Sequence, residues 1–136
     1  METVNPRYDA LKNALQRLEE IGKKSKTDII RDATIQRFEF TYEAAWKALR
    51  YHLMEKHGTV CPSPKSCFRG ALTVGILTPE QTEMALQMTD DRNLTTHTYD
   101  EALADQIYQR ILEHYLPLFL LLWQRIKEET DFGVTK

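Results

Sequence analysis

The 136-residue sequence holds few of the residues that break helices or crosslink chains: five glycines, five prolines and two cysteines. It also lacks a run of about 18 apolar residues, which argues against a transmembrane helix. The opening residues, METVNPRYDA, contain no apolar signal stretch, so we expect a cytoplasmic protein. The length predicts a single domain, residues 1–136, built around one core.

Charge and cysteine usage exclude two specialised classes. Eighteen basic and 20 acidic residues leave a net charge of −2, whereas proteins that coat nucleic acid non-specifically are usually basic. Any contact with RNA would therefore be local. Cys61 and Cys67 lie in CPSPKSC, which is not a CxxC motif, and two cysteines alone do not make a disulfide scaffold. We expect both to be reduced thiols.

The hydrophobic pattern is helical throughout. Apolar residues recur at three- and four-residue spacing, and no alternating run is long enough to build a sheet. Gly22 is placed to end the first helix in a left-handed conformation, and Gly58 is placed to end the second helix. The predicted helices span about residues 7–21, 28–56, 64–75, 79–93 and 99–126.

Capping residues locate the helix starts more sharply than periodicity does. Thr78 with Gln81, and Thr98 with Glu101, each match a capping box, in which two side chains satisfy the free backbone groups at a helix start. The last helix should therefore begin right after Thr98. Pro117 lies within this helix and should distort it locally.

The last helix carries LPLFLLLW, residues 116–123, which is apolar on nearly every side. One face can pack on the bundle, but a domain of this size offers no obvious cover for the other. We expect a second copy of the chain to cover it. The expected fold is all-α: an up-and-down four-helix bundle with one extra short helix, assembled as a homodimer.

The connection before the last helix, RNLTTHTYDE (residues 92–101), gathers polar side chains. In an ordinary turn, Arg92 would meet the helix dipole favourably, Asn93 would end the helix and Tyr99 would pack. In a phosphate site, Arg92 would offer a fork of donors, and His97 would move protons near neutral pH. The free N–H groups that open the next helix would also favour an anion. The spacing leaves both interpretations open.

The second interpretation supplies the groups needed to cleave RNA without a metal or a cofactor. His97 would act as general base toward the ribose 2′-hydroxyl, or as general acid toward the leaving oxygen. Arg92 would stabilise charge in the transition state, and Asn93 adds a neutral hydrogen-bonding amide. One histidine per chain cannot easily do both jobs, but a symmetric dimer would bring two together.

Three segments together resemble the nucleotidyltransferase substrate-binding protein family, which has the HEPN fold: FEFTYEAAWKAL (38–49), SPKSCFRGALTVGIL (63–77) and RNLTTHTYDE. The likeness extends over almost the whole chain. It departs at TEMALQM in the fourth helix, where the family leads us to expect a tryptophan. The resemblance implies an all-α dimer that works with a separate minimal nucleotidyltransferase, encoded by a neighbouring gene.

Related HEPN proteins act as ribonuclease toxins and carry an Arg-x4-6-His signature, matched here by Arg92 and His97. Some of these toxins have a tyrosine two residues later, to which the partner transferase attaches AMP and so silences the toxin. The resemblance therefore implies that RNA is the substrate and that Tyr99 is a modification target. Lys65 and Arg69, one turn apart on the third helix, are weaker candidates for phosphate binding.

Two function classes remain. The chain is either a metal-independent endoribonuclease, the toxin half of a toxin–antitoxin pair, or a non-catalytic substrate-binding subunit of a two-component nucleotidyltransferase. A plain dimeric interaction module remains if no transferase gene lies nearby. The chain lacks a Gly-rich phosphate loop and the GS-x-aspartate pattern of a nucleotidyltransferase, so it should not transfer nucleotides itself.

No metal site is expected from the sequence. Asp90 and Asp91 are adjacent and would point about 100° apart on a helix, so we interpret them as a solvated acidic patch. His52 and His57 flank the end of the second helix, without other ligands at a metal-binding spacing. We interpret them as surface or C-cap histidines.

Overall fold

The computed structural model describes residues 5–130, which form helices and no strand. The helices are α1 (Pro6–Gly22), α2 (Asp28–His57), α3 (Pro64–Thr73), α4 (Pro79–Leu94), α5 (Glu101–Arg110) and α6 (Leu116–Glu129). A 3-10 turn, η1 (Thr95–His97), follows α4, and a π-helical turn, η2 (Ile111–Tyr115), joins α5 to α6. The predicted all-α fold is confirmed. Within this range no helix combines the length and apolarity that crossing a membrane would need.

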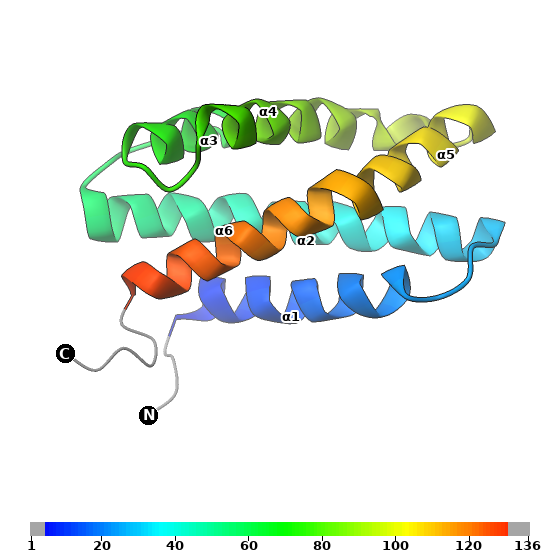
Figure 1. The fold of residues 1–136 in the computed structure, drawn as a ribbon, viewed down its shortest axis with the longest axis horizontal. Helices are drawn as coiled ribbons and strands as arrows, with labels where there is room; N and C mark the ends of the chain where they lie inside the picture. Colours follow the sequence, from blue (N-terminus) through cyan, green and yellow to red (C-terminus); the bar gives the residue numbers. More distant parts are fainter. Residues whose placement is uncertain (1–4, 131–136) are drawn as a thin grey trace.

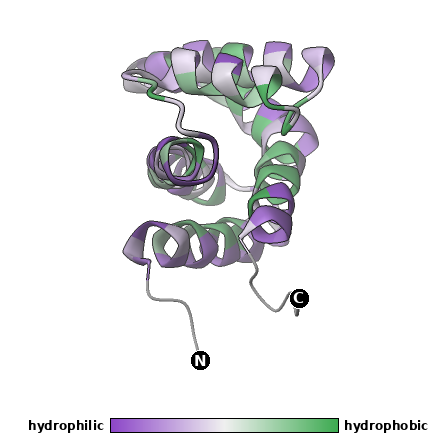
Figure 2. Cartoon of the chain, turned by 90° about the vertical axis from the view of Figure 1, so that its left-hand side faces the viewer, coloured by the Kyte–Doolittle hydropathy of each residue, from purple (hydrophilic) through white to green (hydrophobic). Residues whose placement is uncertain are grey.

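Helix α2 lies at the centre of the bundle. Figure 1 shows α1 along one side of it, the α3–α4 layer along the other, and α5 and α6 running obliquely across. Figure 2, viewed almost along α2, shows apolar segments on the sides of the neighbouring helices that face it. Phe38 of α2 stacks on Tyr115 with ring centroids 5.7 Å apart and contacts Phe119 at 6.0 Å. Each such buried ring stabilises the fold by roughly 2–3 kcal/mol.

The last helix begins at Glu101, and the prediction that it starts after Thr98 is wrong. Asp100 is its N-cap, and the Asp100 carboxylate accepts a hydrogen bond from the Leu103 N–H at 3.2 Å. The Thr98 hydroxyl instead donates to the carbonyl oxygen of Thr95 at 3.3 Å, as the chain leaves the 3-10 turn. The helix starts two residues later than predicted, so Asp100 and not Thr98 stands at the capping position.

Two of the predicted helix boundaries are confirmed and one differs. The Thr78–Gln81 capping box opens α4, and Gly58 ends α2 with a left-handed φ of 63°. Gly22, by contrast, stays within α1 and has no positive φ. A Cβ atom at Gly22 would lie 3.1 Å from the side chain of Leu112, so the glycine allows α1 to approach η2 closely.

The distortion expected at Pro117 takes the form of the π turn. Proline has no N–H and its ring clashes with the preceding turn of a regular helix. Just before it, the Leu116 N–H bonds to the carbonyl of Ile111, five residues back. Apart from exposed Pro117, every residue of 116–123 is buried or half-buried within one chain. The bundle therefore covers more of this segment than the sequence suggested.

Cys61 and Cys67 form a disulfide, and both side chains are buried. The prediction of two reduced thiols is wrong in this structure. The loop after α2 folds back onto α3 and brings the two Cα atoms to 5.1 Å, well within the range that a disulfide spans. This proximity arises from the tertiary fold, which the spacing in CPSPKSC does not reveal.

Candidate functional site

The C-terminal end of α4 is held by a buried carboxylate. Asp91, 4% exposed, accepts hydrogen bonds from Arg110 at 2.7 and 3.1 Å and another from the Tyr115 hydroxyl. The Asp91 carboxylate raises the pKa of Arg110, and burial together with Asp91 raises the pKa of Tyr115. The prediction of a solvated acidic patch is therefore wrong for Asp91. Only Asp90 is exposed, and it pairs with Lys65 at 2.8 Å.

The start of α5 is anchored by a buried arginine. Arg31, near the start of α2, donates hydrogen bonds to Glu101, Asp105 and Asp32, each at 3.0 Å. The hydrogen bonds to Glu101, Asp32 and Asp105 raise the pKa of Arg31 far above its ordinary value. Because α4 ends and α5 begins at such anchors, the connection between them has a defined position.

Arg92 follows Asp91 in the sequence but contacts α2. Its guanidinium lies 3.6 Å from the Glu39 carboxylate and 3.9 Å from that of Glu43, and it donates to the Thr95 hydroxyl at 3.2 Å. Its Nε is buried and has no hydrogen-bond partner among residues 5–130. Arg92 thus keeps one unused donor, although its charge already faces two carboxylates.

His97 and Tyr99 lie on the surface beyond this helix end. Nδ1 of His97 is 3.2 Å from the Tyr99 hydroxyl, and the two rings meet edge to face. Tyr99 is 81% exposed, because it belongs to the turn before α5 and not to the helix. Tyr99 is therefore not packed against the bundle, as it would be in an ordinary turn, and its phenol is open to solvent.

The candidate residues form two neighbouring groups. Arg92 faces Glu39, whereas His97 faces Tyr99, and no hydrogen bond or ion pair within the described chain joins Arg92 to His97. Asn93 is exposed in the last turn of α4. A site that used all of these residues would need a substrate to bridge the two groups.

The other anion-binding candidates are less open than the sequence implied. Lys65 is engaged by Asp90, while Arg69, one turn later on α3, is exposed. The N–H groups at the start of α5 already face the Asp100 carboxylate, which accepts from Leu103. An incoming anion would meet this negative charge, so the predicted anion site at the helix start is occupied by the protein's own cap.

A second polar cluster, missed by the sequence analysis, lies at the other end of α2. His52 is fully buried and contacts the Tyr8 hydroxyl through Nδ1 at 3.0 Å and Glu129 through Nε2 at 2.7 Å. His57 contacts the same Glu129 oxygen at 2.8 Å. The prediction of surface histidines is wrong for His52. Its spacing from Leu49, three residues earlier on the core face, was the available signal.

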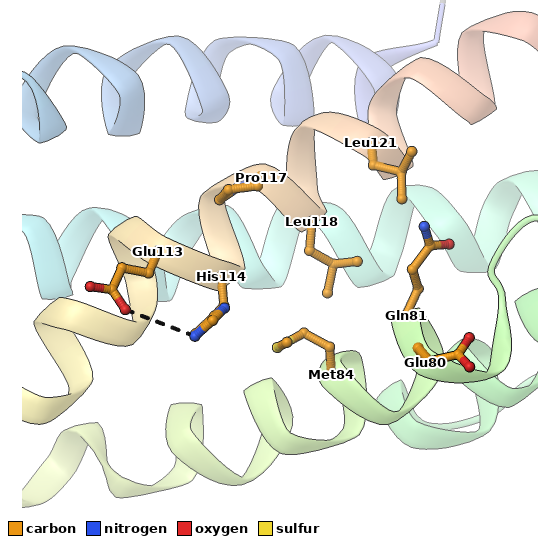
Figure 3. Close-up of a pocket in the computed structure, with 8 residues that line it drawn as sticks. All are labelled: Glu80, Gln81, Met84, Glu113, His114, Pro117, Leu118 and Leu121. Carbon is orange, nitrogen blue, oxygen red and sulfur yellow. Dashed lines mark ion pairs between the residues drawn. The ribbon is translucent and has the colours of Figure 1, made fainter.

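An open groove of about 330 Å³ runs between α4 and the last helix (Figure 3). In Figure 3 the side chains of Met84 and Leu118 approach each other from the two helices, and His114 pairs with Glu113 at 3.9 Å. The groove therefore has an apolar floor and a polar border. Its residues are Glu80, Gln81, Met84, Glu113, His114, Pro117, Leu118 and Leu121.

Sequence comparison identifies the family. The family model described as "nucleotidyltransferase substrate binding protein like" matches residues 6–128. No curated protein sequence matches the chain significantly. Among solved structures, a protein from Thermus thermophilus is 44% identical to this chain. The match covers 86% of this chain and 98% of that one, with a TM-score of 0.82.

More distant structures share the fold. A tri-AMPylated Shewanella oneidensis HEPN toxin in complex with its MNT antitoxin is 19% identical, with a TM-score of 0.73 over 93% of this chain and 100% of that chain. A toxin–antitoxin crystal structure with AMP-PNP is 17% identical, with a TM-score of 0.71 over 91% and 100%. The fold is therefore HEPN-like, and the chain belongs to the nucleotidyltransferase substrate binding protein like family.

Proposed function

We propose that this chain is the HEPN toxin of a two-gene toxin–antitoxin pair, a metal-independent endoribonuclease restrained by a separate minimal nucleotidyltransferase. The observation that carries the proposal is the exposed pairing of His97 with Tyr99, just after the helix end that bears Arg92 and Asn93. This arrangement follows the Arg-x4-His-x-Tyr pattern. A structural neighbour that is an AMPylated HEPN toxin bound to its antitoxin supports the assignment.

The geometry suits a proton transfer at His97. Because Nδ1 is engaged by Tyr99, Nε2 is left to accept the proton of a ribose 2′-hydroxyl. The 2′ oxygen would then attack the phosphorus, and the 5′ oxygen would leave with a proton from a second acid. The partly exposed guanidinium of Arg92 would stabilise a phosphate oxygen as the negative charge on that oxygen grows.

The second acid would be His97 of another copy. As a separate part of the proposal, the chain forms a homodimer that uses the groove between α4 and α6. The groove offers an apolar floor with a polar border, which is the usual anatomy of a protein interface. Leu118 and half-buried Leu121 supply part of this floor from α6. A second copy would remove these side chains from water.

Leu121→Glu is expected to convert the dimer into monomers, because it would place a charge on the apolar floor of the groove. Sedimentation equilibrium of the variant and the parent measures this. Leu72→Glu makes the same change on α3, outside the groove, and should leave the dimer intact. A monomeric parent, or equal dimers in all three proteins, would remove the groove from the proposal.

The function is tested by inducing the chain alone, beside its His97→Ala variant, and by incubating both purified proteins with RNA and a chelator. The parent should stop growth and cleave RNA. His97→Ala should slow cleavage by about 10²–10⁴-fold, the usual contribution of a general acid or base. Thr96→Ala, an exposed change in the same 3-10 turn, should retain both effects.

The second candidate, a non-catalytic substrate-binding subunit for the same transferase, is favoured by one observation. Glu39 and Glu43 face Arg92, and Asp100 caps α5 close by, so the surroundings are acidic and repel RNA phosphate. Under this function neither the parent nor His97→Ala cleaves RNA or slows growth. That result would replace the toxin proposal.

A further inference from the structure

The side chains of His52, His57 and Glu129 form a compact cluster where the ends of α2 and α6 meet. Nε2 of His52 lies 2.7 Å, and Nε2 of His57 2.8 Å, from one carboxylate oxygen of Glu129. One potential ligand atom from each residue lies within 4.8 Å of the other two. His52 is fully buried, whereas the other two side chains keep partial access to solvent.

A third helix orients the buried histidine. The Tyr8 hydroxyl of α1 lies 3.0 Å from Nδ1 of His52 and thereby directs Nε2 of that ring toward Glu129. A neutral phenol can donate to Nδ1 or accept from it, and so fits either imidazole tautomer. Metal-binding histidines are commonly held by such a second contact.

We propose that His52, His57 and Glu129 bind a divalent metal ion of the zinc class. Two imidazole nitrogens and one carboxylate oxygen are a donor set that zinc accepts, with water in the fourth position. With bonds of about 2.0–2.1 Å, ligand atoms of a tetrahedral ion lie roughly 3.3 Å apart. The contacts of 2.7 and 2.8 Å and the limit of 4.8 Å bracket that value, so small side-chain movements would admit the ion.

The two histidine rings carry their protons on different nitrogens in the hydrogen-bonded cluster and in the proposed metal-bound cluster. In the hydrogen-bonded cluster, Nε2 of each histidine donates its proton to Glu129. In the metal-bound cluster, each Nε2 gives its lone pair to the ion, and the neutral ring carries its proton on Nδ1. His52 would then donate to the Tyr8 hydroxyl, which is already within hydrogen-bond distance.

This metal site lies apart from the candidate ribonuclease site. Along α2, His52 is roughly 20 Å from Glu39, the contact of Arg92, at a rise of about 1.5 Å per residue. Figure 1 shows the end of α6 and the start of α5 at opposite ends of the bundle. The ion would join α2 to α6 and stabilise the fold. The inference therefore does not depend on RNA cleavage.

Titration of the full-length chain, freed of metal by a chelator, tests the proposal. Zn²⁺ binding is measured by calorimetry, and Co²⁺ binding by visible absorption. One ion per chain is expected. The melting temperature should rise by several degrees, because an ion that binds only the folded state stabilises it by mass action.

Variants of Glu129 provide a matched comparison. Glu129→Gln and His57→Gln each remove a ligand at a partly exposed position, so both variants should fold. Their zinc affinity should fall at least about 10–100-fold, the loss expected even from changing an outer-shell group. Glu128→Gln, at the exposed neighbouring position, should bind as the parent does. No binding by the parent, or equal binding by the Glu128 and Glu129 variants, would overturn the proposal.

Discussion

Replacing Asp91 with alanine is expected to lower the free energy of unfolding by about 3 kcal/mol. The change leaves the Arg110 guanidinium without its paired acceptor and the buried Tyr115 hydroxyl without the carboxylate. Removing one partner of a buried ion pair typically costs about 3–5 kcal/mol. The Arg110 side chain is 31% exposed and keeps some contact with water, so the lower end of this range applies.

Urea denaturation of parent and variant measures the change. Asp90→Ala is the matched control, because Asp90 is the exposed neighbour and only pairs with Lys65 on the surface. Exposed pairs contribute little, so this variant should stay within about 0.5 kcal/mol of the parent. Equal losses at the two positions would show that burial of the Asp91 carboxylate does not determine its contribution.

The same substitution should also loosen the candidate site. Asp91 anchors the end of α4 to the last helix, while the adjacent Arg92 contacts Glu39 of α2. Without the anchor, amide exchange in residues 92–100 should quicken more than in the core of α2. The stability of the fold and the position of Arg92 thus depend on one carboxylate.

Local signals in the sequence were enough to predict most of the helices. Capping residues and left-handed glycines act through neighbours within a few residues, so the Thr78–Gln81 box and Gly58 were read correctly. The start of α5 was predicted wrongly, because Thr98 and Asp100 are both suited to capping a helix. Thr98 is used by the 3-10 turn, and Asp100 caps the helix whose Glu101 is held by Arg31.

The sequence could indicate which polar side chains are buried in the core, but it could not indicate which partners they bind. Arg31 and His52 lie on the apolar face of α2, and Asp91 lies three residues after buried Met88. A charged or polar residue at a core position needs a buried partner. The partners lie far along the chain: Arg110 is 19 residues from Asp91, and Glu129 is 77 from His52. Only the fold brings them together.

The candidate site was predicted in part for the same reason. Spacing drew attention to Arg92 and His97 but left an ordinary turn equally open, and only the resemblance to HEPN proteins added Tyr99 as a modification target. Spacing gave no sign that Glu39 and Glu43 would face Arg92, because these residues come from the middle of α2. The choice between RNA cleavage and substrate binding depends on this acidic environment as well as on the motif.

Tyr99→Phe, produced together with the partner nucleotidyltransferase, is expected to inhibit growth as strongly as the unrestrained toxin. In the proposed modification the Tyr99 oxygen attacks the α-phosphate of ATP, a phosphorus–oxygen bond forms and pyrophosphate leaves. The phenol proton would pass to Nδ1 of His97, 3.2 Å away, in the ring tautomer that carries its own proton on Nε2, the opposite of the tautomer that serves RNA cleavage. Phenylalanine keeps the ring but has no oxygen to modify, so the restraint should be lost.

Growth under joint induction and the intact mass of the purified chain measure this outcome. The parent should gain adenylate mass and permit growth, whereas Tyr99→Phe should stay unmodified. Tyr51→Phe removes a half-buried phenol on α2 and should behave as the parent does. Tyr99→Phe must also be toxic when produced alone, since the phenol contacts His97.

The two readouts separate modification from simple binding of the partner. If Tyr99→Phe remains unmodified but growth is still restored, the transferase restrains the toxin by covering it, and the phenol is not the switch. If adenylate mass persists in the variant, the target is another residue. Only joint loss of mass and of restraint assigns control to Tyr99, the 81% exposed side chain that contacts His97. An adenylate attached there would stand beside His97 and place its negative phosphate where RNA phosphate must bind.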